Sequence, residues 1–221
     1  MLLIDGIFRF LHRNRLRSYR GRTRKGQHQR LHELGKISTW RGLEPLEFRI
    51  LLSTDTALIG LDQFLATLPP LTGEGHTAVI IDDGINQNHS VLAANIWTNP
   101  GEIAGNGQDD DSNGAIDDVH GYNFVASNGD TFDSLGHGTH VAGTIGAVGD
   151  NDLGVTGVAW DVSLLPLKWA EGRIGDLHNA IAAINYATMM RNSGLNVKII
   201  NNSWQTSFSS PALYDAVAAT R

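Results

Sequence analysis

The sequence contains no cysteine, which excludes disulfide bonds and thiolate metal ligands and leaves the redox compartment open. It also contains no run of about 18 apolar residues, so no segment is predicted to span a membrane. With 221 residues, the chain is long enough for one domain with a sizeable hydrophobic core. Such a domain must be held together without covalent cross-links.

Basic residues are scarce in most of the chain and concentrated at its start. Residues 1–49 carry 12 of the 17 Lys and Arg residues but 4 of the 23 Asp and Glu residues, whereas residues 50–221 have a net charge of about −14. The basic segment lacks a sustained apolar period, so we expect a flexible, solvated tail and no nucleic-acid partner. The alternatives are an arm that binds nucleic acid or another polyanion, and part of an export signal.

Three regions are expected along the chain. Residues 1–53 form a basic leader, residues 54–72 a linker that ends in a turn-rich Pro-Pro-Leu-Thr-Gly stretch, and residues 73–221 a folded domain. The leader includes Leu43–Ser53, which resembles the Leu-Glu-Pro-Arg-x-Leu-Leu tag of planctomycete exported proteins, although its basic residue comes late, at Arg49. A chance match or a structural linker is the alternative. The tag implies an extracellular or cell-envelope location.

Strand-like and helix-like segments alternate after residue 73, which predicts an α/β fold with a mainly parallel sheet. Apolar runs predict strands over 77–82, 163–169 and 197–204, with Pro166 weakening the second. A helix is predicted after Asp176, a plausible N-cap, with Leu177, Ile181, Ile184 and Thr188 on one face. A second helix begins at Pro211 and should lead into a further strand.

Two motifs carry chemistry. One buried strand ends in Asp82, and His137 opens a helix rich in small residues. A hydroxyl nucleophile needs a neutral imidazole to take its proton, and that imidazole needs a buried carboxylate to fix its tautomer. Side chains at the carboxyl ends of strands in an open α/β sheet meet in a ligand crevice. The two motifs therefore predict an orienting carboxylate and a general base.

In this chain order, Ala78–Gly84 and Gly136–Gly143 resemble the Asp and His blocks of the subtilisin-like serine peptidases, and the likeness extends from about Gly75 to Arg221. The resemblance implies a subtilisin-like α/β fold with helices on both faces of the sheet. It assigns the triad carboxylate to Asp82, the triad base to His137 and a packing role to His140. Asp83 stands where Thr or Ser is usual.

The resemblance also implies contacts with an extended peptide or protein substrate. The family's two peptide-flanking segments match Gly172–Gly175 and Asn202–Gln205, so Gly172, Gly175 and Ser203 are the candidate substrate-binding residues. Gln205 stands where glycine is usual, which puts the specificity pocket in doubt. Ser203 reads as a strand residue and not as a nucleophile.

The family's oxyanion Asn block and its nucleophilic Ser block would both lie beyond residue 221, so the fold is expected to be truncated before its last strands. Loss of one oxyanion donor alone costs on the order of 10²–10³ in rate. We therefore expect a serine endopeptidase by family that is inactive as this chain. A non-catalytic fragment that binds peptide or calcium is the alternative.

An acidic loop lies between the two blocks. Carboxylate and amide side chains alternate through it and then a glycine follows, a spacing that can begin to surround a hard cation with oxygens. We therefore predict a structural Ca²⁺ site. The loop is free-standing and not an EF-hand, because His120 stands where an EF-hand has its terminal Glu. A solvated acidic loop is the alternative. The candidate ligands are Asp109, Asp111, Asn113, the carbonyl of Ala115, and Asp117 or Asp118.

Overall fold

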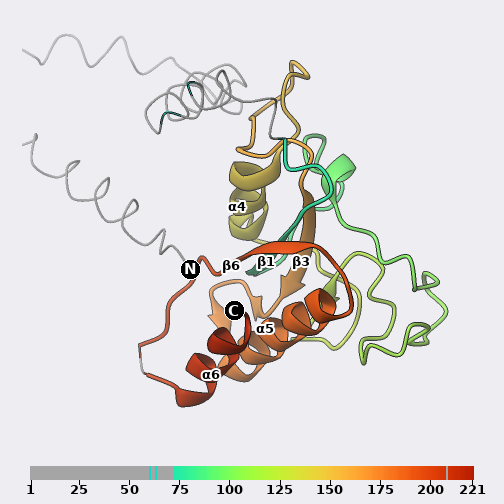
Figure 1. Ribbon diagram of the computed structural model, residues 1–221, viewed down its shortest axis with the longest axis vertical. Helices are drawn as coiled ribbons and strands as arrows, with labels where there is room; N and C mark the ends of the chain where they lie inside the picture. The colour runs from blue at the N-terminus through green and yellow to red at the C-terminus, as the bar shows by residue number, and fades with distance from the viewer. Residues whose placement is uncertain (1–59, 61–62, 64–71, 208) are drawn as a thin grey trace, which may run out of the picture. The chain divides into compact units, whose positions relative to one another are not determined.

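The structure, a computed structural model, describes residues 72–207 and 209–221 together with the single residues 60 and 63 (Figure 1). The predicted basic leader, its possible export tag and nearly all of the predicted linker lie outside the described residues. Within the described part of the chain, no helix is long and apolar enough to cross a membrane.

A four-stranded parallel sheet forms the centre of the fold. Its strands are β1 (Thr77–Asp82), β2 (Tyr122–Asn123), β3 (Ser163–Lys168) and β6 (Val197–Asn201), in the order β2-β3-β1-β6. Every residue of β1 is buried, as expected for a central strand covered on both faces. The predicted α/β fold with a parallel sheet is confirmed, and β6 ends three residues earlier than the sequence suggested.

Pro166 lies inside β3 without breaking it. On the side of β3 that faces β2, Leu164 forms a bridge with Ile96. The two pairs with β2 begin further along the strand, at Leu167. Pro166 falls between these pairs, where no donor is needed from it. The strand therefore tolerates a residue that has no N–H group.

Helices cover both faces of the sheet, as Figure 1 shows. One face carries α4 (His137–Gly146), and the other carries α5 (Leu177–Asn192) with α6 (Pro211–Ala219) packed beside it. A short 3-10 turn, η2 (Ala93–Asn95), follows β1. Immediately after β3 the chain forms a small antiparallel hairpin, whose strands are β4 (Ala170–Glu171) and β5 (Ile174–Gly175).

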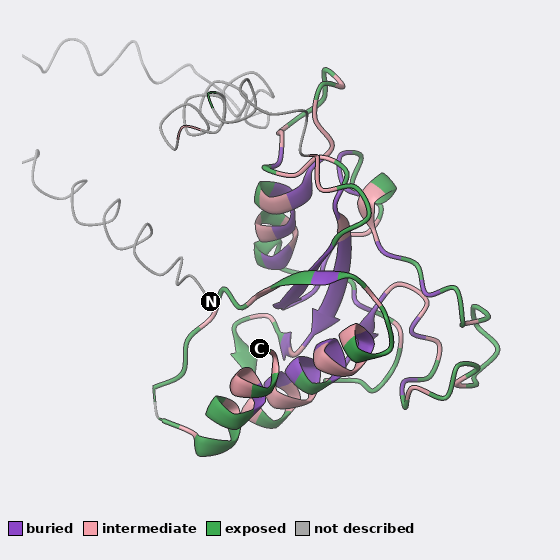
Figure 2. Cartoon of the chain, viewed as in Figure 1, coloured by how far each residue is buried: buried purple, intermediate pink, exposed green. Residues whose placement is uncertain are grey.

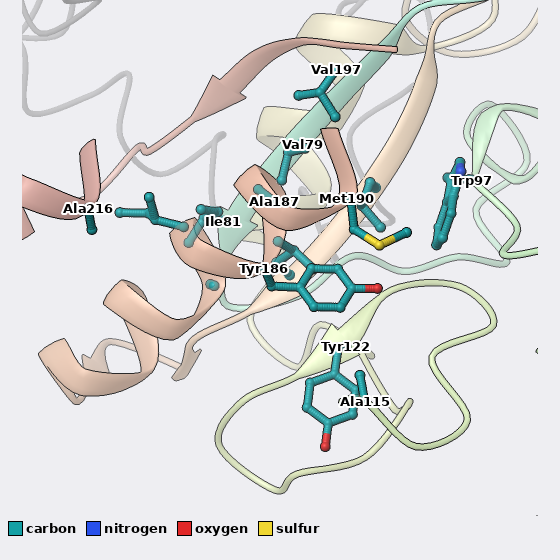
Figure 3. Close-up of a cluster of buried hydrophobic side chains, with 14 residues drawn as sticks. Val79, Ile81, Trp97, Ala115, Tyr122, Tyr186, Ala187, Met190, Val197 and Ala216 are labelled. Atoms are coloured by element: carbon teal, nitrogen blue, oxygen red, sulfur yellow. The ribbon is translucent and has the colours of Figure 1, made fainter. Parts of the chain in front are cut away.

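Alternate residues of the central strands supply two hydrophobic clusters. Val79 and Ile81 belong to the cluster under α5, whereas Ala78 and Ile80 belong to the cluster under α4. Figure 2 shows the buried strands between the helices, and Figure 3 shows the α5 cluster, in which Tyr186 lies close to the sheet. The strand β6 lies at the edge of the sheet and is partly exposed, and Ile199 within it is 54% exposed.

The predicted helix caps are present. The Asp176 carboxylate accepts a hydrogen bond from the N–H of His178, and Ser210 accepts one from the N–H of Leu213, with Pro211 at the first turn of α6. Of the four residues that share the predicted face of α5, Ile184 is buried and the other three are half-buried. Small residues let α5 approach the sheet on a different face, which consists of Ala180, Ala183, Ile184, Tyr186, Ala187 and Met190.

Candidate active site

The structure brings Asp82 and His137 together. Asp82 ends β1 and is 4% exposed, while His137 is the first residue of α4. The two residues are far apart in sequence, yet His137 Nδ1 lies 2.7 Å from Asp82 Oδ1. The pair is therefore built by packing α4 against the carboxyl end of the central strand.

The geometry fixes the chemistry of the imidazole. A carboxylate can only accept a hydrogen bond, so His137 must carry a proton on Nδ1 to donate to Asp82. In the neutral ring this leaves Nε2 as an acceptor, and Nε2 has no hydrogen-bond partner among the described residues. The side chain of His137 is 56% exposed. The free nitrogen can therefore take a proton from a group that approaches from solvent.

Electrostatics favour the protonated form of His137. Burial alone would lower its pKa, but the hydrogen bond to Asp82 and the charges of Asp82, Asp83 and Asp133 outweigh that effect and raise the pKa above 6.5. The imidazolium that a general base must form is thus stabilised in place.

Asp83 is a second buried carboxylate beside the pair. It is 4% exposed, and its Oδ1 accepts a hydrogen bond of 2.8 Å from the N–H of Gly138. Burial, opposed by that hydrogen bond, together with the neighbouring carboxyl groups of Asp82 and Asp133 raises the pKa of Asp83 to about 6. One carboxylate oxygen each of Asp82 and Asp83 and one ring nitrogen of His137 lie within 4.8 Å of one another. Because like charges repel, ionisation of one of two carboxyl groups so close together disfavours ionisation of the other.

Lys168 was missed by the sequence reasoning. It ends β3, directly beside Asp82 in the sheet, and it is 4% exposed. Its Nζ donates to the carbonyl of Phe132 and forms an ion pair of 2.8 Å with Glu171, whose other carboxylate oxygen accepts from Ser134. Lys168 therefore ties the loop before α4 to the sheet. Its position after an apolar run gave no signal of this role.

The candidate substrate-binding residues lie on two exposed segments. Gly172 occupies the turn of the β4–β5 hairpin with a φ of 61°, and Gly175 ends β5. Ser203 follows β6, and its hydroxyl accepts a hydrogen bond from the Asn201 amide. In the described part of the chain, none of the three forms a hydrogen bond with Asp82 or His137.

A pair of tryptophans brings these two segments together. The rings of Trp169, which precedes the hairpin, and Trp204, which follows Ser203, have centroids 4.6 Å apart. Gly175 lies directly on the Trp169 ring, since a Cβ at that position would be 2.3 Å from the ring. Only glycine therefore fits there without a shift of the ring or the hairpin.

The acidic loop also gathers carboxylates. One carboxylate oxygen from each of Glu102, Asp109 and Asp111 lies within 4.8 Å of the other two. Glu102 Oε1 accepts from the N–H groups of Asp110 and Asp111, whereas Oε2 is buried and has no partner among the described residues. Burial raises the pKa of Glu102 despite those two hydrogen bonds. An all-oxygen set with one unpaired buried atom suits a hard cation such as Ca²⁺.

The carboxylates of Asp109 and Asp111 also accept hydrogen bonds within the loop, both from the N–H of Asn113. The other predicted ligands are likewise engaged within the protein. Asn113 donates from Nδ2 to Asp118, which is fully buried and also accepts from the hydroxyl of Tyr186. Asp117 accepts from two N–H groups of the preceding turn, and Ala115 is buried. Glu102 was missed from the sequence, because it lies seven residues before the first ligand of the alternating pattern.

The sequence of the folded domain matches a known protein family. The family model described as Peptidase_S8, the subtilase family, matches residues 73–220. The chain belongs to the subtilase family.

Individual subtilases are similar over part of their length. Subtilisin-like protease 1 of Plasmodium berghei is 39% identical over 137 residues, which are 61% of this chain and 23% of that protein. An extracellular protease of Xanthomonas campestris pv. campestris is 33% identical over 129 residues, 56% of this chain and 22% of that protein. The crystal structure of a cold-adapted subtilisin-like serine proteinase is 26% identical, with a TM-score of 0.50 over 68% of this chain and 44% of that one. The chain thus spans less than a quarter of the length of these two relatives.

Proposed function

We propose that residues 73–221 are the N-terminal part of the catalytic domain of a subtilisin-like serine endopeptidase. The observation that supports this most strongly is the 2.7 Å hydrogen bond between His137 Nδ1 and the buried carboxylate of Asp82. In the proposed reaction, Nε2 of His137 takes the proton of a serine hydroxyl, and Asp82 keeps the ring in the required tautomer and stabilises its positive charge.

The proposed substrate is an extended segment of a peptide or protein. β5 and the segment after β6 are held side by side by Trp169 and Trp204, and both are largely exposed. Exposed backbone of this kind can bind an extended chain through main-chain hydrogen bonds. Ile174, which is 83% exposed on β5, would contact side chains of that substrate. Gly172, Gly175 and Ser203 remain the proposed contact residues.

The proposal includes a statement about the 221 residues taken alone. They contain no Gly-Thr-Ser block, and no serine hydroxyl in the described part of the chain donates to His137. We therefore expect no peptidase activity and no labelling by a fluorophosphonate probe, which reacts with activated serines. Labelling that disappears in His137→Ala would show that one of the present serines is activated and would overturn this statement.

We also propose that the acidic loop binds a structural Ca²⁺ through Glu102, Asp109 and Asp111. A cation that binds the folded state alone stabilises it by mass action, so calcium should raise the melting temperature. Glu102→Gln and Asp111→Ala should each remove the increase. Asp110→Asn is the matched control, because its carboxylate accepts from Ile103 and Asn106 outside the cluster. An unchanged calcium response in Glu102→Gln would show that the site lies elsewhere.

An extracellular or cell-envelope location is part of the proposal. It is supported by the relative in Xanthomonas campestris pv. campestris that is called an extracellular protease. The Leu43–Ser53 tag would supply the export signal. Fusion of residues 1–53 to a reporter protein tests this, and retention of the fusion inside the cells would contradict it.

A further inference from the structure

We propose that Asp133 is a positioning residue, which together with Asp83 caps the first turn of α4 and thereby holds His137 against Asp82. This inference rests on the proposed role of His137 as the general base and adds the groups that place it.

The first turn of α4 has no cap of its own. Its N-cap residue is Gly136, which adopts a left-handed φ of 91° and has no side chain to accept a hydrogen bond. The first N–H groups of any helix have no partner within the helix, and buried ones need partners elsewhere. Gly138, the second residue of α4, is buried. The partners of this turn must therefore come from other segments.

Two buried carboxylates supply those partners. Asp83 accepts from the N–H of Gly138 at 2.8 Å, and Asp133 Oδ2 accepts from both the N–H and the hydroxyl of Thr139, at 2.9 and 2.6 Å. Negative groups at a helix N-terminus also interact favourably with the helix dipole. The residues on the C-terminal side of His137 are thus fixed by acceptors that α4 does not contain.

Asp133 also fixes the turn on the other side of His137. Its Oδ1 accepts from the N–H groups of Leu135 and Gly136, at 2.9 and 2.6 Å. One carboxylate that is 5% exposed therefore accepts four hydrogen bonds, from groups both before and after His137. No other described carboxylate brackets the histidine in this way. Hydrogen bonds to an ionised acceptor are stronger than those between neutral groups. The four bonds to Asp133 therefore hold the backbone on both sides of His137 rigidly.

The network continues to the strand that carries Asp82. Thr139 Oγ1, which donates to Asp133, accepts from the N–H of Asn86 in the loop that follows β1. Asp133 therefore links α4 to the segment just beyond Asp82. The 2.7 Å His137–Asp82 bond joins α4 to β1, so a rotation of the first turn of α4 that separates the two atoms by about 1 Å would break it.

The charged groups around His137 divide into two kinds. Asp82, Asp83 and Asp133 face the imidazole, while Lys168 and Glu171 pair with each other beside the loop that carries Asp133. Burial opposes ionisation of Asp133, but its hydrogen bonds from Thr139, Gly136 and Leu135 are stronger and lower its pKa. Asp133 thus stays ionised through the neutral range, whereas Asp83 titrates near 6. The permanent cap is therefore Asp133.

The test is ¹⁵N NMR of the imidazole rings in the full 221-residue chain, with His137→Gln used to assign the His137 signals. Above the pKa, ring ¹⁵N shifts report which nitrogen carries the proton, and a ring released from its partner redistributes that proton between Nδ1 and Nε2. We expect the Nδ1–H form in the parent chain, its loss together with a lower His137 pKa in Asp133→Ala, and a partial loss in Asp133→Asn. Asp161→Asn, which changes an exposed aspartate, should leave the tautomer and the pKa unchanged.

The outcomes separate this inference from the proposed function. If Asp133→Ala fails to fold, Thr139→Val carries the test, since it removes one donor to Asp133 and keeps the shape of the side chain. A folded variant that keeps the Nδ1–H form would overturn the positioning role and leave the proposed function intact, even if its His137 pKa is lower, because loss of the Asp133 charge alone lowers that pKa. A parent chain without the Nδ1–H form would overturn both.

Discussion

Gly138 offers the sharpest test of how closely α4 packs against the sheet. A Cβ at this position would lie 2.1 Å from the carbonyl oxygen of Gly84, 3.0 Å from Asp82 Cβ and 3.0 Å from Asp83 Oδ1. The first of these is a clash with backbone, which cannot rotate away. Restoring an ordinary contact requires α4 to move by about 1 Å, and such a movement would lengthen the 2.7 Å bond between His137 and Asp82 beyond hydrogen-bonding range.

We therefore expect Gly138→Ala to lower the free energy of unfolding by about 1–3 kcal/mol, the usual cost of overpacking. For a chain of this length, this corresponds to a decrease in melting temperature of about 2–4 °C per kcal/mol. The same variant should lose the Nδ1–H tautomer of His137. Thermal unfolding followed by circular dichroism and ¹⁵N NMR measure the two effects.

Gly143 provides the matched control within the same helix. A Cβ there would meet only Val155 Cγ2, at 3.8 Å. Gly143→Ala should stabilise the chain by about 0.5–1 kcal/mol, because alanine loses less backbone entropy in a helix. Equal stability of the Gly138 and Gly143 variants, with the His137 tautomer retained in both, would refute the close packing from which the active-site geometry is argued.

Two further substitutions test buried polar groups. The raised pKa of Asp83 means that the folded chain binds this proton more tightly than the unfolded chain, so stability is lost as pH rises from about 4 to about 6. Asp83→Asn should remove that loss and gain about 3 kcal/mol at pH 7 in urea unfolding. A variant less stable than its parent at pH 7 would contradict this. Tyr186→Phe leaves the buried carboxylate of Asp118 one donor short and should lower stability by about 1–3 kcal/mol in the same assay, whereas no change would mean that water replaces the hydroxyl.

Much of the fold follows from short stretches of sequence. The six-residue apolar run of β1 predicts a central strand, and Asp176 and Ser210 mark the starts of α5 and α6, because strand burial and helix capping depend on neighbouring residues. Asp82 and His137 were recognised from their motifs and lie together as predicted.

The features that were missed depend on contacts between distant segments. The buried face of α5 is built from alanines, and whether a small side chain faces the sheet depends on how closely the helix packs. Asp133 accepts hydrogen bonds from its own loop and from α4, a pattern that no spacing in the sequence displays. Glu102 reaches its neighbours through the folding of the acidic loop.

The central claim, that Asp82 and His137 are the orienting carboxylate and the base of a serine endopeptidase, is tested by turnover in a completed enzyme. The chain is extended after Arg221 with a relative's segment that carries the Ser and Asn blocks, and hydrolysis of a fluorogenic peptide is measured against pH. Activity should rise with pH with a midpoint above 6.5, because the pKa of His137 is raised. His137→Ala should lower kcat by several orders of magnitude and Asp82→Ala by somewhat less, with Asp161→Asn unchanged. Full activity in both active-site variants would contradict the account.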